Sequence, residues 1–171
     1  KGLVLSTIKS YSEAIVYFNK AIELKANFAE AWLNKGNSLH QLKQSDEALI
    51  CIDKAISLKE DFKEAWLSKG LIFHELTQYK EAIASIDKAL ELEANFAEAF
   101  LNKGLVFHEM KSNEEALTLI DKALELKENY KEAWLIKGIV LSSLKRNDEA
   151  LSSVDKALEL KENYKEAWLT K

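Results

Sequence analysis

The sequence of 171 residues contains no proline, one cysteine and only five glycines. Few residues are therefore available to turn a β-hairpin or to bring backbone close to a ligand phosphate. No apolar run approaches the ~20 residues that a bilayer-spanning helix needs. The 24 basic and 28 acidic residues give a net charge of −4, so no basic surplus attracts nucleic acid or anionic lipid. We expect a helical, soluble protein with neither nucleic acid nor a membrane as its partner.

The composition that is present suits a folded core, because 47% of the residues are apolar and 30% are charged. The single cysteine, Cys51, excludes a disulfide within the chain and suits a reducing compartment. The first residues, Lys1-Gly2, include no Met and begin no secretory pattern. These features favour a cytoplasmic location and indicate a fragment of a longer protein.

Residues recur along the whole chain at intervals of 34. The five glycines show this period, and so do five aromatic residues, which are Gly2, Gly36, Gly70, Gly104 and Gly138, and Trp32, Trp66, Phe100, Trp134 and Trp168. Two series of alanines, beginning at Ala14 and at Ala21, keep the same step. A fixed period in this range is the signature of a repeat protein, so the sequence is one structural unit copied several times.

Each unit resembles a tetratricopeptide repeat, which has an aromatic residue, a small residue four later, a large apolar residue three after that, and two alanines in a second helix. One unit reads Trp66, Gly70, Phe73, Ala82, Ile86 and Ala89. The resemblance implies an all-α fold, a right-handed superhelical solenoid of antiparallel helix pairs. Two positions depart from the family. Its Leu before the glycine is Lys here (Lys35, Lys69, Lys103, Lys137), and its late proline is Glu60, Ala94, Glu128 or Glu162.

We count positions in a unit from the residue three before the aromatic. One array over 1–171 then contains full units 29–62, 63–96, 97–130 and 131–164, with partial units 1–28 and 165–171. Apolar residues at steps of three and four predict a first helix over 65–76 and a second from Ala82 to Leu90, with a polar break at Thr77-Gln78. Small residues at positions 8, 20 and 27 allow the helix axes to approach closely.

Both helices of a unit have end signals. An Asn or Asp followed three residues later by Glu predicts a capping box before each first helix, as at Asn27 and Glu30 or at Asp61 and Glu64. Lysines close four of the second helices, where a cation suits the negative dipole end: Lys25, Lys59, Lys127 and Lys161. The caps partly replace the missing prolines.

Each first helix has one apolar face that packs inward, and a second line of residues along it that packing does not require. The resemblance implies that positions 2, 5, 6, 9, 12 and 13 line a concave groove for a peptide or a partner helix. On this chain the implied groove is Leu33, Asn34, Asn37, His40, Leu67, Leu71, His74, Leu101, Asn102, Leu105, His108, Leu135, Ile136, Ile139 and Ser142. The leucines at positions 5 and 9 have an alternative role, because they could pack against the first helix of the adjacent unit. Both roles stay open.

Narrower signals in this stripe are weak. Asn34 and Asn102 match a ladder of asparagines that holds peptide backbone in some family members, but Ser68 and Ile136 interrupt it. The family's clamp for chaperone carboxylate tails is excluded, because Glu98 stands where it needs Lys. The three histidines all occupy position 12, and packed helices ~8–10 Å apart are too distant to share a zinc ion at ~2 Å. We expect ordinary polar contacts there and no metal.

The sequence offers no catalytic constellation. No two glycines lie closer than 34 residues, so it has no phosphate-binding loop, and no nucleophile elbow occurs. Cys51 belongs to no motif and is expected on an exposed helix. The aspartates of the Asp53 series are each followed by Lys, which is typical of a solvated face. We expect neither an enzyme nor a cofactor.

The favoured hypothesis is a non-catalytic interaction scaffold whose groove binds a peptide or helix of a partner. One alternative is a structural or designed solenoid without a ligand, because residues 121–135 and 155–169 are identical. A further alternative is that the chain is the interaction arm of a larger enzyme. Residues 97–130 contain 4 basic and 7 acidic residues, so the partner should be apolar to basic. Both ends of the chain cut a first helix in the same register, which predicts head-to-tail self-association with Lys171 and Trp168 of one molecule near Lys1 of the next.

Overall fold

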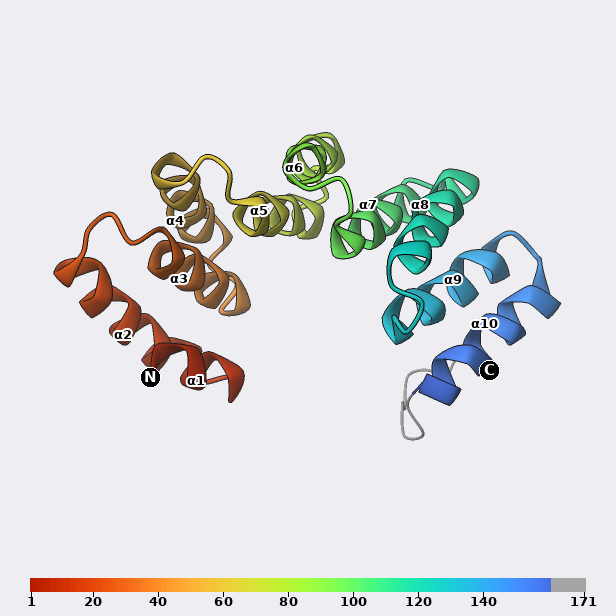
Figure 1. The fold of residues 1–171 in the computed structure, drawn as a ribbon, viewed down its shortest axis with the longest axis horizontal. Helices are drawn as coiled ribbons and strands as arrows, with labels where there is room; N and C mark the ends of the chain where they lie inside the picture. The colour runs from red at the N-terminus through yellow and green to blue at the C-terminus, as the bar shows by residue number, and fades with distance from the viewer. Residues whose placement is uncertain (161–171) are drawn as a thin grey trace. The chain divides into compact units, whose positions relative to one another are not determined.

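The computed structural model describes residues 1–160, and in this range all regular structure is helical (Figure 1). The helices in chain order are α1 (Gly2–Thr7), α2 (Tyr11–Leu24), α3 (Ala29–Gln41), α4 (Ser45–Leu58), α5 (Lys63–Glu75), α6 (Tyr79–Leu92), α7 (Ala97–Glu109), α8 (Asn113–Leu126), α9 (Lys131–Ser143) and α10 (Asn147–Leu160). Each full unit begins its first helix at position 1 and its second at position 17. The all-α prediction is confirmed.

The chain divides into two compact units, Lys1–Leu92 and a second that begins at Glu93. The first contains α1 to α6, and the second contains α7 to α10 within the described residues. In both, each first helix packs against the second helix that follows it through a loop of three residues, such as the loop between α3 and α4. Such short loops join antiparallel neighbours.

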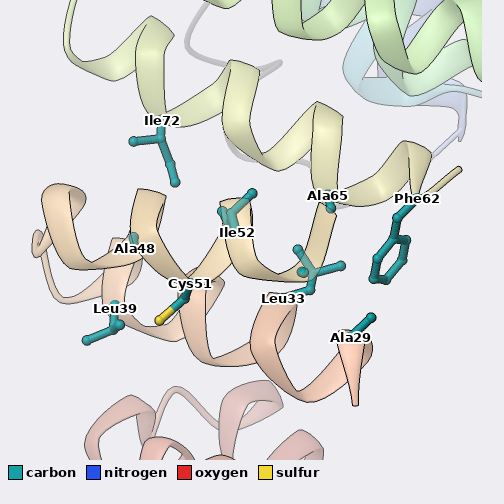
Figure 2. Close-up of a cluster of buried hydrophobic side chains, with 10 residues drawn as sticks. Ala29, Leu33, Leu39, Ala48, Cys51, Ile52, Phe62, Ala65 and Ile72 are labelled. Carbon is teal, nitrogen blue, oxygen red and sulfur yellow. The ribbon is translucent and has the colours of Figure 1, made fainter. Parts of the chain in front are cut away.

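One core cluster of the first unit is formed by three successive helices (Figure 2). Leu33 and Leu39 come from α3, Ile52 comes from α4, and Ile72 comes from α5. Ile52 and Ile72 are fully buried, and burial of such a side chain contributes about 1.5–3 kcal/mol. Ile72 therefore joins α5 to the second helix of the preceding repeat.

The glycines lie at close contacts between helices, as predicted. A Cβ added to Gly36 would lie 2.8 Å from Cγ1 of Ile52 and 3.1 Å from the carbonyl oxygen of Ala48. A Cβ added to Gly70 would lie 2.6 Å from Cγ1 of Ile86. Since these separations are shorter than van der Waals contact, the first and second helices of a repeat can approach this closely only with glycine at position 8.

The second unit repeats this arrangement. Its core contains fully buried Ile120, Ala133 and Val140, with Trp134 and Tyr130 partly buried against it. Lys127 Nζ lies 3.1 Å from Glu98 Oε1 and 4.4 Å from the centre of the Tyr130 ring.

The capping-box prediction is wrong. The N-caps of α3, α5, α7 and α9 are Phe28, Phe62, Phe96 and Tyr130, and none of them has a side-chain capping hydrogen bond. The polar residue lies one place too early, because an aromatic residue occupies the cap; the Phe62 and Phe96 side chains are buried. The indole of Trp32 instead holds the preceding loop, donating to the Ala26 carbonyl at 3.0 Å.

The lysine prediction for the second helices is confirmed where the structure can test it. Lys25, Lys59 and Lys127 are the C-caps of α2, α4 and α8. Lys161 lies outside the described residues.

First helices end without proline or glycine. In α5 the Thr77 N–H donates to the His74 carbonyl and the Gln78 N–H donates to the Phe73 carbonyl, each at 2.9 Å. This is the Schellman pattern, which needs a left-handed residue at Thr77. The same position has a positive φ in all five repeats, at Lys9, Lys43, Thr77, Lys111 and Lys145.

Cys51 is not exposed, in contrast to the sequence-based expectation. Its side chain is only 4% accessible and faces the glycine stripe of α3, where a Cβ on Gly36 would lie 3.3 Å from the Cys51 Cβ. Burial raises the pKa of its thiol. None of the described helices combines the length and the hydrophobicity that crossing a bilayer would require.

Candidate peptide groove of the first unit

A hollow of about 510 Å³ opens between α3 and α5. Five of the residues predicted to line a groove meet there: Asn34, Asn37, His40, Leu71 and His74. They come from positions 6, 9 and 12, so a single face of each first helix is exposed to one shared space. The stripe identified in the sequence thus becomes a continuous surface within the first unit.

The hollow has further lining residues that the sequence prediction did not include. Ser6 comes from α1 and Tyr11 begins α2, and the others extend the stripe on α3 and α5: Ser38, Gln41, Ser68 and Glu75. Gln41 and Glu75 occupy position 13, which the resemblance had already implied. The sequence pattern does not indicate Ser6 or Ser38. Ser6 lies on α1 in a partial unit, and Ser38 occupies position 10, which is apolar in the other units, as in Ile72, Val106 and Val140.

The leucines at position 5 take the alternative role. Leu33, Leu67, Leu101 and Leu135 are at most 9% exposed and belong to the core. Their burial favours packing over ligand contact. At position 9, Leu71 and Leu105 are half-buried and Ile139 is exposed.

The predicted groove residues of the second unit do not belong to this hollow. Asn102, Leu105 and His108 lie on α7, and Ile139 lies on α9. His108 Nδ1 is 2.7 Å from Asn113 Oδ1, so the ring donates to the start of α8. Because an amide oxygen only accepts, this contact places a proton on Nδ1.

The asparagine ladder is partly used by the helices themselves. Asn34 Nδ2 donates to the Glu30 carbonyl at 2.6 Å, and Asn102 Nδ2 donates to the Glu98 carbonyl at 2.7 Å. Each bond spans one helical turn, which ties the amide nitrogen to its own backbone. The Oδ1 of Asn34 therefore remains as an acceptor, and one of its two N–H donors is already engaged.

One ion cluster joins the two helices at the mouth of the hollow. Glu75 Oε1 lies 3.3 Å from His40 Nε2, and Glu75 Oε2 accepts from Lys43 Nζ at 3.0 Å. The hydrogen bond from Lys43 lowers the pKa of the Glu75 carboxyl. Glu75 is 46% exposed, so an ionised and accessible carboxylate stands at this point.

His40 itself is nine-tenths buried. Its Nε2 faces a carboxylate and therefore donates to it, while its Nδ1 is buried without a hydrogen-bond partner. The His74 ring packs 6.2 Å from that of Tyr79. No group of three His, Cys, Asp or Glu side chains within residues 1–160 is arranged to hold a metal ion.

Several polar side chains of the lining are not used in hydrogen bonds within the described part of the chain. The Tyr11 hydroxyl, the Asn37 and Gln41 amides and the Ser68 hydroxyl form no hydrogen bond within residues 1–160. Each amide offers two donors and one acceptor, and each hydroxyl offers both functions. These four side chains can pair with peptide N–H and C=O groups without regard to the sequence of the peptide.

Tetratricopeptide repeat family models match most of the chain. They cover residues 29–62 (tetratricopeptide repeat), 70–111 (TPR repeat), and 1–28, 97–130 and 131–164 (tetratricopeptide repeat). The chain belongs to the tetratricopeptide repeat family. Repeats of this family are generally non-catalytic interaction modules.

Solved structures agree on the fold. TTC0263, a thermophilic TPR protein of Thermus thermophilus, aligns with a TM-score of 0.88 at 19% identity, covering 98% of this chain and 92% of that one. MamA from Desulfovibrio magneticus RS-1 aligns with a TM-score of 0.77 at 20% identity over 95% and 92%. YrrB, described as a TPR protein with an unusual peptide-binding site, aligns with a TM-score of 0.70 at 23% identity over 98% and 87%. No curated protein sequence shows significant similarity.

Proposed function

We propose that this protein is a non-catalytic interaction scaffold and that the hollow between α3 and α5 binds an extended peptide segment of a protein partner. The observation behind this proposal is the lining of the hollow. It combines the half-buried Leu71 with hydroxyls and amides that form no hydrogen bond within residues 1–160, those of Tyr11, Asn37, Gln41 and Ser68. An extended peptide presents unpaired backbone donors and acceptors, and these side chains satisfy them. Leu71 supplies apolar contact for a ligand side chain.

Two further observations support a peptide as the ligand. The relative YrrB has a peptide-binding site according to its description, and the family generally serves interaction. The lining contains one full charge at neutral pH, that of Glu75. A segment of apolar to basic character therefore suits it better than an acidic one.

On the second unit, the corresponding first-helix positions at Asn102, Leu105, His108 and Ile139 stay part of the proposed binding surface.

The test is selection of peptides from a displayed random library by the full chain. A double variant, Asn37→Leu with Ser68→Ile, replaces both polar groups by residues that this chain itself has at the same positions, in Leu71 and Ile136. The fold should tolerate these changes, while binding of the selected peptides should fall by about ten-fold for two lost hydrogen bonds.

The control is Ile50→Leu, a change on the exposed face of α4, outside the proposed binding surface. It should leave the affinity of the selected peptides unchanged. Selection of no peptide at all, or equal binding by the double variant, would show that the hollow is not the site.

A second candidate function, head-to-tail self-association, is favoured by one observation on α1. Val4 is 64% exposed, whereas the residues at the same position in α5, α7 and α9 (Ile72, Val106, Val140) are fully buried. Ile72 is covered by α4, a second helix of this same chain. We propose that a second helix of another copy covers Val4 in the same way.

Sedimentation velocity over a concentration series tests the self-association. Val4→Glu should abolish any concentration dependence. Val16→Glu should not, because position 22 is exposed in α2 and also in α4, where Ile50 occupies it. A wild-type monomer at every concentration would refute this proposal. The part of the hypothesis that names Trp168 and Lys171 lies outside the described residues.

A further inference from the structure

Among the residues that line the hollow, Glu75 is the single fully charged side chain at neutral pH. Within the part of the chain that the structure describes, the lining contains no lysine or arginine, and its other polar residues carry hydroxyls, amides and imidazoles. An anionic ligand would therefore meet repulsion and no compensating cation. A cationic group would find one carboxylate with no competing positive charge on the wall of the hollow.

The carboxylate already holds a cation, but that cation comes from outside the lining. Lys43 follows the last turn of α3, at the left-handed cap position, and reaches across to α5 with Nζ 3.0 Å from Glu75 Oε2. Its side chain is 76% exposed. Because exposed ion pairs of this kind contribute little net stability, Lys43 can leave Glu75 at small cost.

Glu75 is nevertheless held in place. His40, nine-tenths buried in α3, lies 3.3 Å from Glu75 Oε1 through Nε2. His74 precedes Glu75 on α5, and its charged form would favour the ionised carboxylate. Departure of Lys43 would thus leave a carboxylate that is still oriented by the neighbouring histidine.

We propose that Glu75 is a cation subsite of this groove, where an arginine or lysine side chain of the bound peptide replaces the ammonium group of Lys43. The inference rests on the proposed function, because it assigns the charge of the peptide that the hollow accepts. Arginine fits best, since its planar guanidinium can bond both oxygens of a carboxylate at once, whereas Lys43 engages one. Lys43 acts as an intramolecular stand-in that competes with the ligand.

The experiment compares two blocked pentapeptides that differ in charge alone, acetyl-Ala-Ala-Arg-Ala-Ala-amide and the same peptide with citrulline in place of arginine. Citrulline keeps the shape of arginine but is neutral. Binding to the full chain is measured by NMR titration. The arginine peptide should bind about five-fold more tightly or better, with the largest shifts at Glu75, His40 and Asn37.

Two variants separate the roles of the charges. Glu75→Gln should lower the affinity for the arginine peptide to that for the citrulline peptide. Lys43→Met keeps the aliphatic stem, removes the competitor and should raise the affinity for the arginine peptide by about two- to five-fold, the range that an exposed ion pair allows.

The matched control is Lys111→Met. Lys111 occupies the same position in the second unit with φ of 68° and forms no ion pair within residues 1–160. It should leave both affinities unchanged, and thermal unfolding should show that every variant is folded.

Equal binding of the arginine and citrulline peptides to the wild type would overturn the cation subsite and leave the peptide groove standing. A preference for arginine that survives Glu75→Gln, or no gain in Lys43→Met, would also overturn it. If neither pentapeptide binds, the subsite is refuted, while the groove itself is judged by the library selection and the Asn37 and Ser68 variant.

Discussion

Lys69 Nζ lies 2.7 Å from Asp53 Oδ1 and 5.5 Å from the centre of the Trp66 ring. Lys137 repeats the arrangement in the second unit, 2.7 Å from Asp121 Oδ1 and 5.2 Å from the Trp134 ring. This lysine stands where the family resembled by the sequence has leucine. Its stem can pack as leucine does while its charge pairs with the preceding second helix, so the departure from the family pattern is accommodated by a residue 16 positions earlier.

The first prediction concerns this pair. A double-mutant cycle with Lys69→Met and Asp53→Asn should give a coupling free energy of about 0.5–1 kcal/mol, because Asp53 is 55% exposed and water screens the interaction. Urea unfolding at low salt measures it, and the coupling should shrink in 1 M NaCl. A coupling of several kcal/mol would mean that the pair is far better shielded than its exposure indicates.

The repeated fold could be predicted from the sequence because the same pattern of small and apolar residues recurs in each unit. Gly36, Gly70 and the alanines of the second helices recur at 34 residues, and the structure places them at the closest helix contacts. Positions of the helices followed directly from this period. The helix N-termini did not, since Asn27 and Asp61 look like caps while the neighbouring aromatics, Phe28 and Phe62, take the cap position.

The candidate site was predictable only in part. The helix positions of Asn37, His40 and Leu71 predict that they line a groove. The sequence of one unit does not show which of its apolar residues a neighbouring repeat buries. Leu67 and Leu71 look alike in the sequence, and only packing separates them. The contact of Lys43 with Glu75 spans 32 residues between positions 15 and 13 of adjacent units. The opposite charges at that spacing are the sequence signal that predicts this contact.

Thr77→Gly should stabilise the protein. Thr77 has φ of 58°, a region that a β-branched residue occupies at a cost and glycine occupies freely. After the greater chain entropy of glycine in the unfolded state is subtracted, a net gain of about 0.5–1 kcal/mol is expected. Thermal unfolding measures it. The control is Thr118→Gly inside α8, which should destabilise instead; a loss in both variants would mean that Thr77 is not strained.

The thiol of Cys51 should react slowly. It is 4% exposed, and burial raises its pKa, so both access and thiolate content are reduced. In native conditions Ellman's reagent should modify it only through opening of the repeat, and reaction should become complete in urea. Val16→Cys, on the exposed face of α2, supplies the comparison and should react within seconds to minutes. Fast reaction of native Cys51 would place it on the surface after all.

Tyr130 should make the second unit sensitive to alkali. Burial, followed by the charges of Glu98 and Glu132, raises the pKa of Tyr130 from 10.0 to about 12. Because the folded pKa is the higher one, the neutral ring stabilises the fold fully below pH 10, and this contribution is lost as the pH rises toward 12. Absorbance at 295 nm should show a tyrosine step near pH 12, and Tyr130→Phe should remove that step and flatten the loss of stability. A Tyr130 that titrates near pH 10 would contradict the assigned burial.

The last prediction separates the two leucines that the sequence could not distinguish. Leu67 is 9% exposed and belongs to the core, so Leu67→Ser should destabilise the first unit by about 3 kcal/mol or more, through lost apolar burial and a buried hydroxyl. Leu71 is half-buried and lines the hollow, so Leu71→Ser should cost about 1 kcal/mol and act mainly on peptide binding.

Urea unfolding followed by far-UV circular dichroism measures the first effect, and titration with library-selected peptides measures the second. Leu105→Ser, at the position equivalent to Leu71 in the second unit, is the control for the stability cost of losing a half-buried leucine. Similar destabilisation by the Leu67 and Leu71 variants would show that Leu71 is also a packing residue. The apolar wall of the proposed groove would then be lost, and its polar side chains alone would have to hold the peptide.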